Sequence, residues 1–124
     1  MLLKKSICSY MDIVHVADVL NIRNDNVFFQ EGKSWIRVKA KGKITYQAKM
    51  ETPDAGSIVT ETITATADTR DVGYLLNGFE YYIIRLFIGN EILLVGSLDY
   101  PVKKTYTDDS IRTSFTFTCI SPKN

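Results

Sequence analysis

The side chain best suited to proton transfer in this 124-residue chain is its single histidine, His15. A histidine that acts as a general acid or base is normally built beside a nucleophile or a second titratable group. His15 instead lies among valines, and no serine or cysteine stands at a spacing that known catalytic arrangements use. The sequence therefore favours a structural histidine, and we predict that the protein is not an enzyme and has no catalytic residue.

Cysteines and carboxylates are the other groups that could hold a metal ion or a cofactor. Cys8 and Cys119 are the only cysteines, and with one histidine they are too few for a structural zinc site. The carboxylates fall where turns and caps use them, without the alternating oxygen ligands of a calcium loop. No phosphate-binding loop or dinucleotide fingerprint is present. We therefore predict no metal, no cofactor and two reduced, half-buried thiols.

Five cations recur at odd positions along one stretch and are the strongest polar candidate for binding. Alternate residues of a strand share a face, so such a basic face would meet phosphates or an acidic partner at regular intervals. Trp35 is its only aromatic residue, whereas single-strand binders interleave several rings for stacking. We favour a solvated strand face, with nucleic acid as the less favoured partner. The basic face consists of Arg37, Lys39, Lys41, Lys43 and Lys49.

Composition limits the class of protein. The net charge of +1, with 45% apolar and 23% charged residues, indicates one globular domain over residues 1–124 and excludes a globally basic nucleic-acid binder. No window approaches the roughly 18 apolar residues of a membrane-spanning helix. Asp12, His15 and Asp18 interrupt the apolar stretch that a signal peptide would need near the start. We therefore expect a cytoplasmic protein without a membrane partner.

Apolar and polar residues alternate most clearly from residue 35 to residue 50, which predicts one long strand bent at Gly42. The sequence TPDAGS then favours a tight connection to a second strand at 57–67. In the register that pairs the apolar faces, Met50 lies opposite Val59 and Tyr46 opposite Ile63. The predicted hairpin is 35–50/57–67.

Gly89 and Asn90 are typical of a two-residue turn and predict a second hairpin, 79–88/91–98. Both of its faces are apolar. We assign one face to the core, although the sequence leaves open which face that is. A short helix or another subunit must then cover the other face, because monomers seldom leave large apolar patches in water. The candidate oligomer interface is Ile83, Phe87, Ile92 and Leu94.

A third hairpin, 99–107/110–120, is predicted to turn at Asp108 and Asp109, with Tyr106 opposite Ile111. A short helix is expected at 69–77, ended by a left-handed residue at Asn77 or Gly78. Residues 7–20 favour strand over helix. Together these elements predict a mainly β, antiparallel sandwich or partly open barrel of three hairpins with one short helix.

From about residue 56 to the end, the sequence resembles small structural proteins encoded in prophages of gut bacteria, of the tail or head-to-tail connector kind. The similarity follows the order of the elements: a Thr-rich strand after a polar loop, a short Leu-Leu helix, a hairpin, and a terminal Phe-Thr-Phe strand. The shared motifs are VTETITATADTR, Leu75-Leu76, Gly96-Ser97, Asp99-Tyr100-Pro101 and FTFTCISP.

The resemblance implies a non-enzymatic structural protein of virion assembly, forming homo-oligomeric rings or stacked rings and contacting other assembly proteins. It also implies that sheets of neighbouring subunits continue one another, and a place in the virion after assembly. The basic face departs from this pattern, since a DNA-conducting lumen is rarely lined with cations. The alternative is a small β-rich binding module that uses the basic face, Arg37 to Lys49, for nucleic acid or an acidic partner.

Overall fold

The computed structural model describes residues 2–52 and 56–123 and is mainly β, as the sequence predicts. Its strands pair antiparallel and do not close into a barrel, and the described residues contain no helix longer than a single 3₁₀ turn. The strands are β1 (Leu2–Cys8), β2 (Tyr10–His15), β3 (Val19–Arg23), β4 (Asn26–Phe29), β5 (Ile36–Arg37), β6 (Ile44–Glu51), β7 (Ser57–Asp68), β8 (Tyr81–Ile88), β9 (Glu91–Val95), β10 (Val102–Asp108) and β11 (Arg112–Lys123), with 3₁₀ turns η1 (Val16–Asp18), η2 (Thr69–Asp71) and η3 (Gly73–Leu75).

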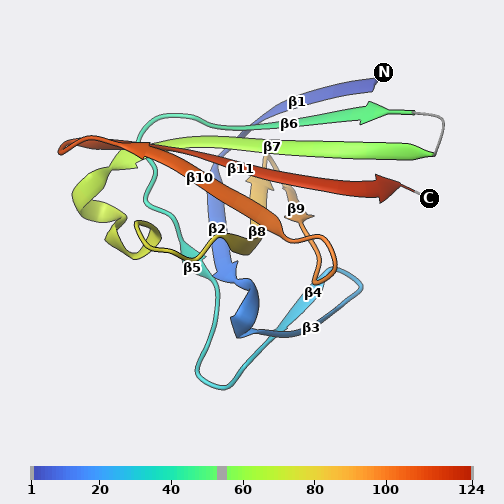
Figure 1. Ribbon diagram of the computed structural model, residues 1–124, viewed down its shortest axis with the longest axis horizontal. Helices are drawn as coiled ribbons and strands as arrows, with labels where there is room; N and C mark the ends of the chain where they lie inside the picture. Colours follow the sequence, from blue (N-terminus) through green and yellow to red (C-terminus); the bar gives the residue numbers. More distant parts are fainter. Residues whose placement is uncertain (1, 53–55, 124) are drawn as a thin grey trace.

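One large sheet folds over on itself to form a sandwich. Its strand order is β1-β6-β7-β11-β10-β8-β2-β5, and β9 pairs with β8. Strands β1 and β2 follow each other in sequence, broken only at Ser9, yet they lie far apart in this order. The sheet therefore bends into two layers, one of β1, β6, β7 and β11 and one of β2, β5, β8 and β9, with β10 between them (Figure 1).

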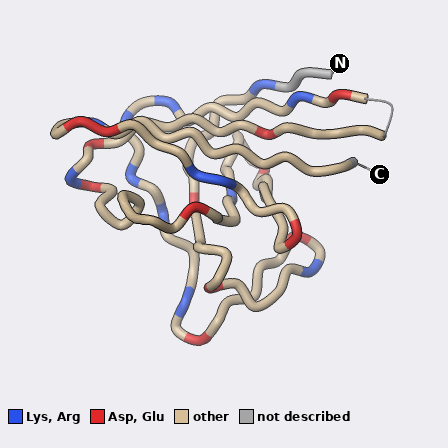
Figure 2. Tube along the Cα trace, viewed as in Figure 1, with Lys and Arg blue, Asp and Glu red and all other residues tan. Residues whose placement is uncertain are grey.

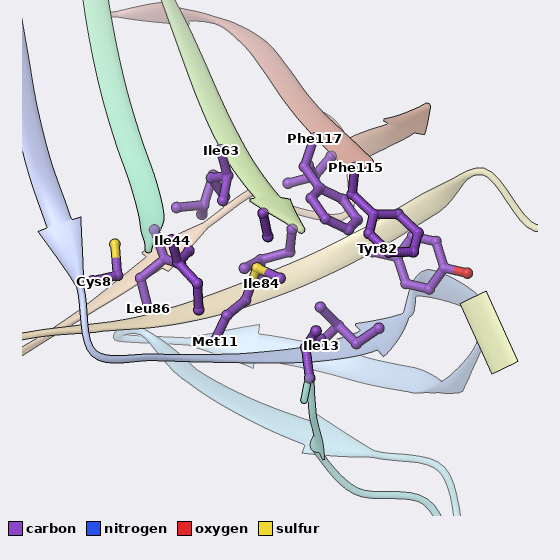
Figure 3. Packing of buried hydrophobic residues seen from close by; sticks show 14 of the residues in the cluster. Cys8, Met11, Ile13, Ile44, Ile63, Tyr82, Ile84, Leu86, Phe115 and Phe117 are labelled. Atoms are coloured by element: carbon purple, nitrogen blue, oxygen red, sulfur yellow. The ribbon is translucent and has the colours of Figure 1, made fainter. Parts of the chain in front are cut away.

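The core fills the space between these layers. Met11 and Ile13 of β2 and Ile84 and Leu86 of β8 point toward Phe115 and the other buried side chains of the opposite layer (Figure 3). This is the arrangement that period-two alternation produces, because every second residue of a strand faces the same side.

Two predicted hairpins have the registers expected from their sequences. In β6 and β7, Met50 lies opposite Val59 and Tyr46 opposite Ile63. In β8 and β9, Leu86 lies opposite Leu93, and the turn contains Gly89 at a φ of +59°. The predicted connection at residues 53–55 lies outside the described residues. Strand was also the correct expectation for residues 7–20, which hold the end of β1, all of β2 and the start of β3.

The single long strand predicted for residues 35–50 is wrong. β5 ends at Arg37, the chain crosses between the layers, and β6 begins at Ile44. Gly42, at a φ of +83°, allows the crossing because only glycine adopts such a backbone at little cost. Val38, Ile44 and Tyr46 are buried as the alternation predicts, but Ile36 is 48% exposed, so the pattern was wrong about the continuity of the strand and about its first apolar residue.

The register of the third hairpin is also wrong. Tyr106 lies opposite Phe115 rather than Ile111, so the pairing is displaced by four residues, and Ile111 falls in the turn, where it is 71% exposed. The reason is a wider turn. The Asp109 carboxylate accepts hydrogen bonds from the backbone N–H groups of Ile111 and Arg112, each at 2.7 Å, and so stabilises a loop longer than two residues.

The short helix at 69–77 is replaced by η2 and η3, two 3₁₀ turns. Its predicted left-handed end is absent, since neither Asn77 nor Gly78 has a positive φ. Asn77 ends the segment through its side chain instead. Its Nδ2 donates to the carbonyl of Tyr74 at 2.6 Å, and its Oδ1 accepts from the N–H of Phe79 at 2.9 Å. Such local side-chain bonds compete with helix formation.

The second apolar face of β8 is covered within the chain. The hairpin of β3 and β4 forms a separate two-stranded sheet, which packs on this face from below the sandwich (Figure 1). Val19 of β3 is buried against Val14 and Ile83. Other apolar side chains of this hairpin, with Trp35 and Leu94, pack around these three residues. Neither of the expected covers, the segment at 69–77 or another subunit, is needed for this part of the face.

Candidate functional site

Four adjacent strands form an arm that extends beyond the second layer. The arm comprises β1, β6, β7 and β11, and their ends reach past β8 and β9 in Figure 1. β7 pairs with β11 along its whole length, from Arg112 to Lys123. β10, on the other side of β11, pairs only as far as Thr118. In the described part of the chain, residues 120–123 therefore have one backbone edge without a strand partner.

The opposite border of the arm is a second free edge. Within residues 2–52 and 56–123, β1 pairs only with β6. Unpaired backbone N–H and C=O groups at such an edge are a template for another strand. Exposed isoleucines lie beside both edges, Ile7 on β1 and Ile120 on β11, each at 59% exposure. Among the described strands, the arm thus has one free backbone edge at each border, each beside an exposed isoleucine.

The four residues predicted as an oligomer interface do not form one exposed patch. Ile83 is fully buried, and Leu94 packs on the cluster beneath β3 and β4. Phe87 is half-buried against the guanidinium groups of Arg37 and Arg85. Only Ile92, on β9, is largely exposed, at 61%. The apolar surface available to a partner therefore lies elsewhere.

The five residues of the predicted basic face do not share a strand. Arg37 is on β5, Lys49 is on β6, and the other three lie on the crossing between them. Carboxylates neutralise four of them: Asp12 pairs with Arg37 at 2.6 Å, Asp71 with Lys39, Asp68 with Lys41, and Glu51 with Lys49. Along residues 37–49 the trace in Figure 2 carries blue segments only, because three of the paired carboxylates lie on other segments and Glu51 lies just beyond this stretch.

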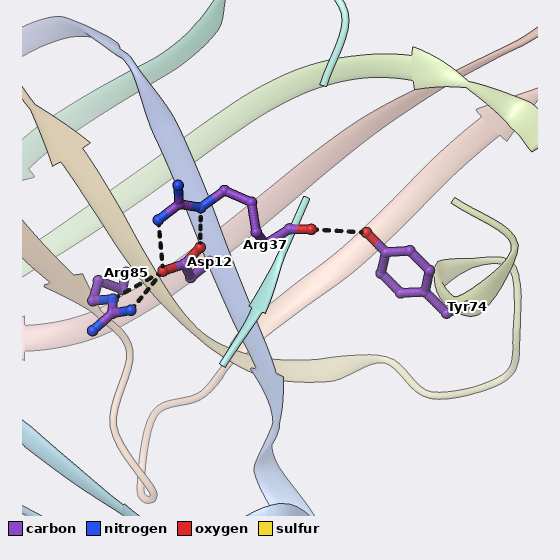
Figure 4. A network of polar contacts seen from close by, with 4 residues as sticks. All are labelled: Asp12, Arg37, Tyr74 and Arg85. Carbon is purple, nitrogen blue, oxygen red and sulfur yellow. Dashed lines mark hydrogen bonds and ion pairs between the residues drawn. The ribbon is translucent and has the colours of Figure 1, made fainter. Parts of the chain in front are cut away.

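The best-connected polar group in the described residues is the buried carboxylate of Asp12 on β2. It lies between two guanidinium groups, Arg37 of β5 and Arg85 of β8 (Figure 4). Arg37 Nε donates to Oδ1 at 2.6 Å, and Arg85 Nη2 donates to Oδ2 at 2.6 Å. Burial pushes the pKa of Asp12 up, but these hydrogen bonds outweigh it and hold the pKa below its ordinary value.

Aromatic rings sandwich the same guanidinium groups. The Arg37 guanidinium lies 4.6 Å from the Tyr10 ring centre and the Arg85 guanidinium 4.7 Å from that of Trp35, with Phe87 between them. Cation–π contacts and the shared carboxylate thus join β2, β5 and β8. This cluster fixes β5 to the sheet. The sequence signal that we missed is a charged residue within each of two apolar runs, Asp12 and Arg85.

Lys104 is a second buried charge that the sequence analysis missed. It lies on the apolar side of β10, where its Nζ donates to the carbonyl of Leu75, to Asn77 Oδ1 and to Tyr82 Oη. Burial lowers the pKa of Lys104, although nearby Glu80 opposes the shift. All three ammonium donors have acceptors, so Lys104 closes the end of η3 rather than presenting a free amine.

The remaining candidates occupy structural positions. Both cysteines are free and more buried than predicted. Burial raises the pKa of the Cys119 thiol to about 11 and also raises that of Cys8. His15 ends β2, and its ring packs on Phe79 at 4.5 Å between ring centres. Among the described residues, no group of three His, Cys, Asp or Glu side chains is placed to hold a metal ion.

Comparison with protein-family models, curated proteins and solved structures gave no match. Across residues 2–52 and 56–123, no helix is long and apolar enough to cross a membrane.

Proposed function

We propose that this chain is a non-enzymatic structural protein that assembles into homo-oligomers, as a prophage-type tail or connector subunit. The observation that carries the proposal is the pair of free strand edges on the arm, β1 on one border and residues 120–123 of β11 on the other. Two free edges on one subunit allow each copy to bind two neighbours.

The directions of the two edge strands suit head-to-tail joining. β1, β6, β7 and β11 alternate in direction, so β1 and β11 run antiparallel across the arm. If neighbouring copies point the same way, β1 of one copy meets β11 of the next as an antiparallel pair. Such a heterologous contact repeats from copy to copy and closes into a ring when the rotation between copies closes.

The side chains beside the two edges also suit this contact. Residues directly opposite each other in a ladder share a face. Across the arm, Ile7 lies level with Thr45, Thr64 and Thr116, and Ile120 lies four residues further along the same face of β11. Joining β1 to the free residues 120–123 of β11 requires a shift of four residues between copies, because β10 already pairs with Thr116. This shift brings Ile7 of one copy opposite Ile120 of the next on one face of the continued sheet, where burial stabilises the joint.

The resemblance to prophage tail and connector proteins over residues 56–124 supports the same class. In this proposal the subunits assemble in the bacterial cytoplasm, become virion components, and contact other assembly proteins. Four of the five basic residues have local carboxylate partners, which favours assembly over the alternative of a nucleic-acid-binding module.

The mass of the purified chain at micromolar concentration, measured by light scattering during size-exclusion chromatography, tests this proposal. We expect a defined multimer, with rings in negative-stain images. Ile120→Lys places a charge at the proposed joint and is expected to give monomers. Ile111→Lys is the matched control, because Ile111 is 71% exposed at the opposite end of β11 and its replacement should leave the mass unchanged. A monomeric wild-type chain that binds short DNA tightly at low salt would instead support the binding module.

A further inference from the structure

A pocket of about 360 Å³ lies beside His15, in a region that the assembly surface does not use. Its walls come from β2, the turn η1, β5 with the loop before it, η3 with the segment after it, and the start of β8. Three large apolar side chains line it and stay exposed: Ile36 of β5, Tyr74 of η3 and Phe79 of the segment after η3. Exposed apolar groups that converge on one hollow indicate a ligand or partner site.

The back of the pocket is held in place by hydrogen bonds. Tyr82 and Asn77 line it, and the buried ammonium group of Lys104 bonds to both from behind. Asn77 is further fixed by its bonds to Tyr74 and Phe79. A binding wall that is already ordered loses little conformational entropy when a ligand enters.

His15 places one polar side chain in the lining of the pocket. Its Nδ1 accepts the backbone N–H of Ala17 at 3.3 Å, so the proton of the neutral ring resides on Nε2. No described residue accepts a hydrogen bond from Nε2. The pocket therefore offers this N–H as a donor beside its apolar wall.

Two opposite charges share the rim of the same pocket. The Asp18 carbonyl accepts the N–H of Gln30 at 2.9 Å, and the Gln30 carbonyl accepts the N–H of Lys33 at 3.0 Å. This chain of backbone bonds ties Asp18 to Lys33 at the base of the β3 and β4 hairpin. In the described part of the chain, neither side chain forms an ion pair.

We propose that this pocket binds a free amino acid with an aromatic or branched apolar side chain. The apolar wall takes the side chain, Lys33 and the His15 Nε2–H take the carboxylate, and Asp18 takes the ammonium group. A site with one cation, one anion and an apolar wall matches a zwitterion with an apolar body better than it matches an ion of either sign. This inference is independent of assembly through the arm.

Titration of the ¹⁵N-labelled chain with phenylalanine, followed by two-dimensional NMR, tests the proposal. We expect shifts of the backbone signals of His15, Asp18, Lys33 and Phe79, with a Kd of about 0.1 to 1 mM for so small a ligand. Phenylpropionate lacks the ammonium group and phenethylamine lacks the carboxylate. Each should bind roughly three- to tenfold more weakly, as expected for the loss of one solvent-accessible charged contact.

Two variants test which side chain binds the ammonium group of the ligand and which binds its carboxylate. Asp18→Asn should bind phenylalanine and phenylpropionate equally. Lys33→Gln should narrow the preference for phenylalanine over phenethylamine to the part that the His15 Nε2–H supplies. Lys43→Gln, on an exposed lysine outside the pocket, should change none of the affinities. The NMR spectrum of each variant reports in the same experiment whether it is folded. The proposal is overturned if phenylalanine shifts no pocket signal at about 10 mM, if all three compounds bind alike, or if both variants keep the wild-type preferences.

Discussion

Asp12 on β2 and Arg85 on β8 lie directly opposite each other in the sheet, and their side chains form a 2.6 Å ion pair. Arg37 bonds to the same carboxylate from β5. Replacement of Asp12 by asparagine leaves both guanidinium groups without a counter-ion. Because both also contact water, we expect a loss of about 2 kcal/mol of unfolding free energy, below the usual cost of breaking a buried pair.

Urea denaturation of Asp12→Asn at neutral pH measures this loss. Lys41→Met provides the control, because it removes a solvent-exposed ion pair with Asp68 at 3.5 Å and should cost well under 1 kcal/mol. Equal, small effects of the two substitutions would show that the Asp12 cluster does not stabilise the sheet.

The same cluster predicts that the free energy of unfolding depends on pH in the acid range. The pKa of Asp12 in the folded chain lies below its ordinary value, because the bonds from Arg37 and Arg85 outweigh the effect of burial. An unfolded aspartate titrates near 3.9, so the contribution of Asp12 is complete above about pH 4 and is lost as pH falls through the lower folded pKa. The stability difference between wild type and Asp12→Asn should therefore shrink from pH 7 to about pH 2.5. A constant stability difference over this pH range would contradict the lowered pKa of Asp12 in the folded chain.

Much of the fold follows from local patterns in the sequence, and the errors have physical causes. The alternation around Tyr46 and the turn at Gly89 specify their hairpins because they act over a few residues. Strand ends depend on contacts far along the chain. Val38 is buried and donates its N–H to Met11, so it resembles a strand residue although the strand has already ended.

The candidate sites were harder to predict for the same reason. Ile83 is covered by β3 and β4. No local pattern in the sequence predicts that these two strands pack on β8. Lys104 and Asp12 are buried only because acceptors or cations from distant segments surround them. The free edges of the arm depend on which strands pair and where each ladder ends, and the sequence pattern does not determine either.

Gly96 is the glycine with the strongest steric requirement. It has a φ of +96°, and a Cβ at this position would lie 2.9 Å from Cγ2 of Val102. Gly96→Ala therefore combines backbone strain with overpacking and should cost about 2 to 4 kcal/mol. Gly42→Ala has similar strain at a φ of +83° but open space around it, so about 1 kcal/mol is expected. Thermal unfolding of both variants would contradict this account if Gly42→Ala were the less stable.

The two thiols should be unreactive in the folded chain. Burial raises the pKa of Cys119 to about 11, and the Glu61 carboxylate adds to the shift. Thiolate at pH 8 is then rarer by roughly a factor of 10² than for a free cysteine, and access is blocked as well. A disulfide-exchange reagent should label both cysteines only after denaturant is added. An Ile111→Cys variant supplies an exposed thiol that reacts at once, and equally fast labelling of the wild type would refute the prediction.

Disulfide trapping between copies tests the assembly proposal most directly. In a background with Cys8→Ser and Cys119→Ser, Ile7→Cys and Ile120→Cys place one thiol beside each free edge of the arm. Mild oxidation of the double-edge variant should give a ladder of covalent multimers, and Ile7→Cys alone should give no dimer, because β1 meets β11 rather than another β1. Covalent dimers from Ile7→Cys alone, or no crosslink from the double-edge variant at concentrations where wild type is multimeric, would contradict head-to-tail joining of the arm.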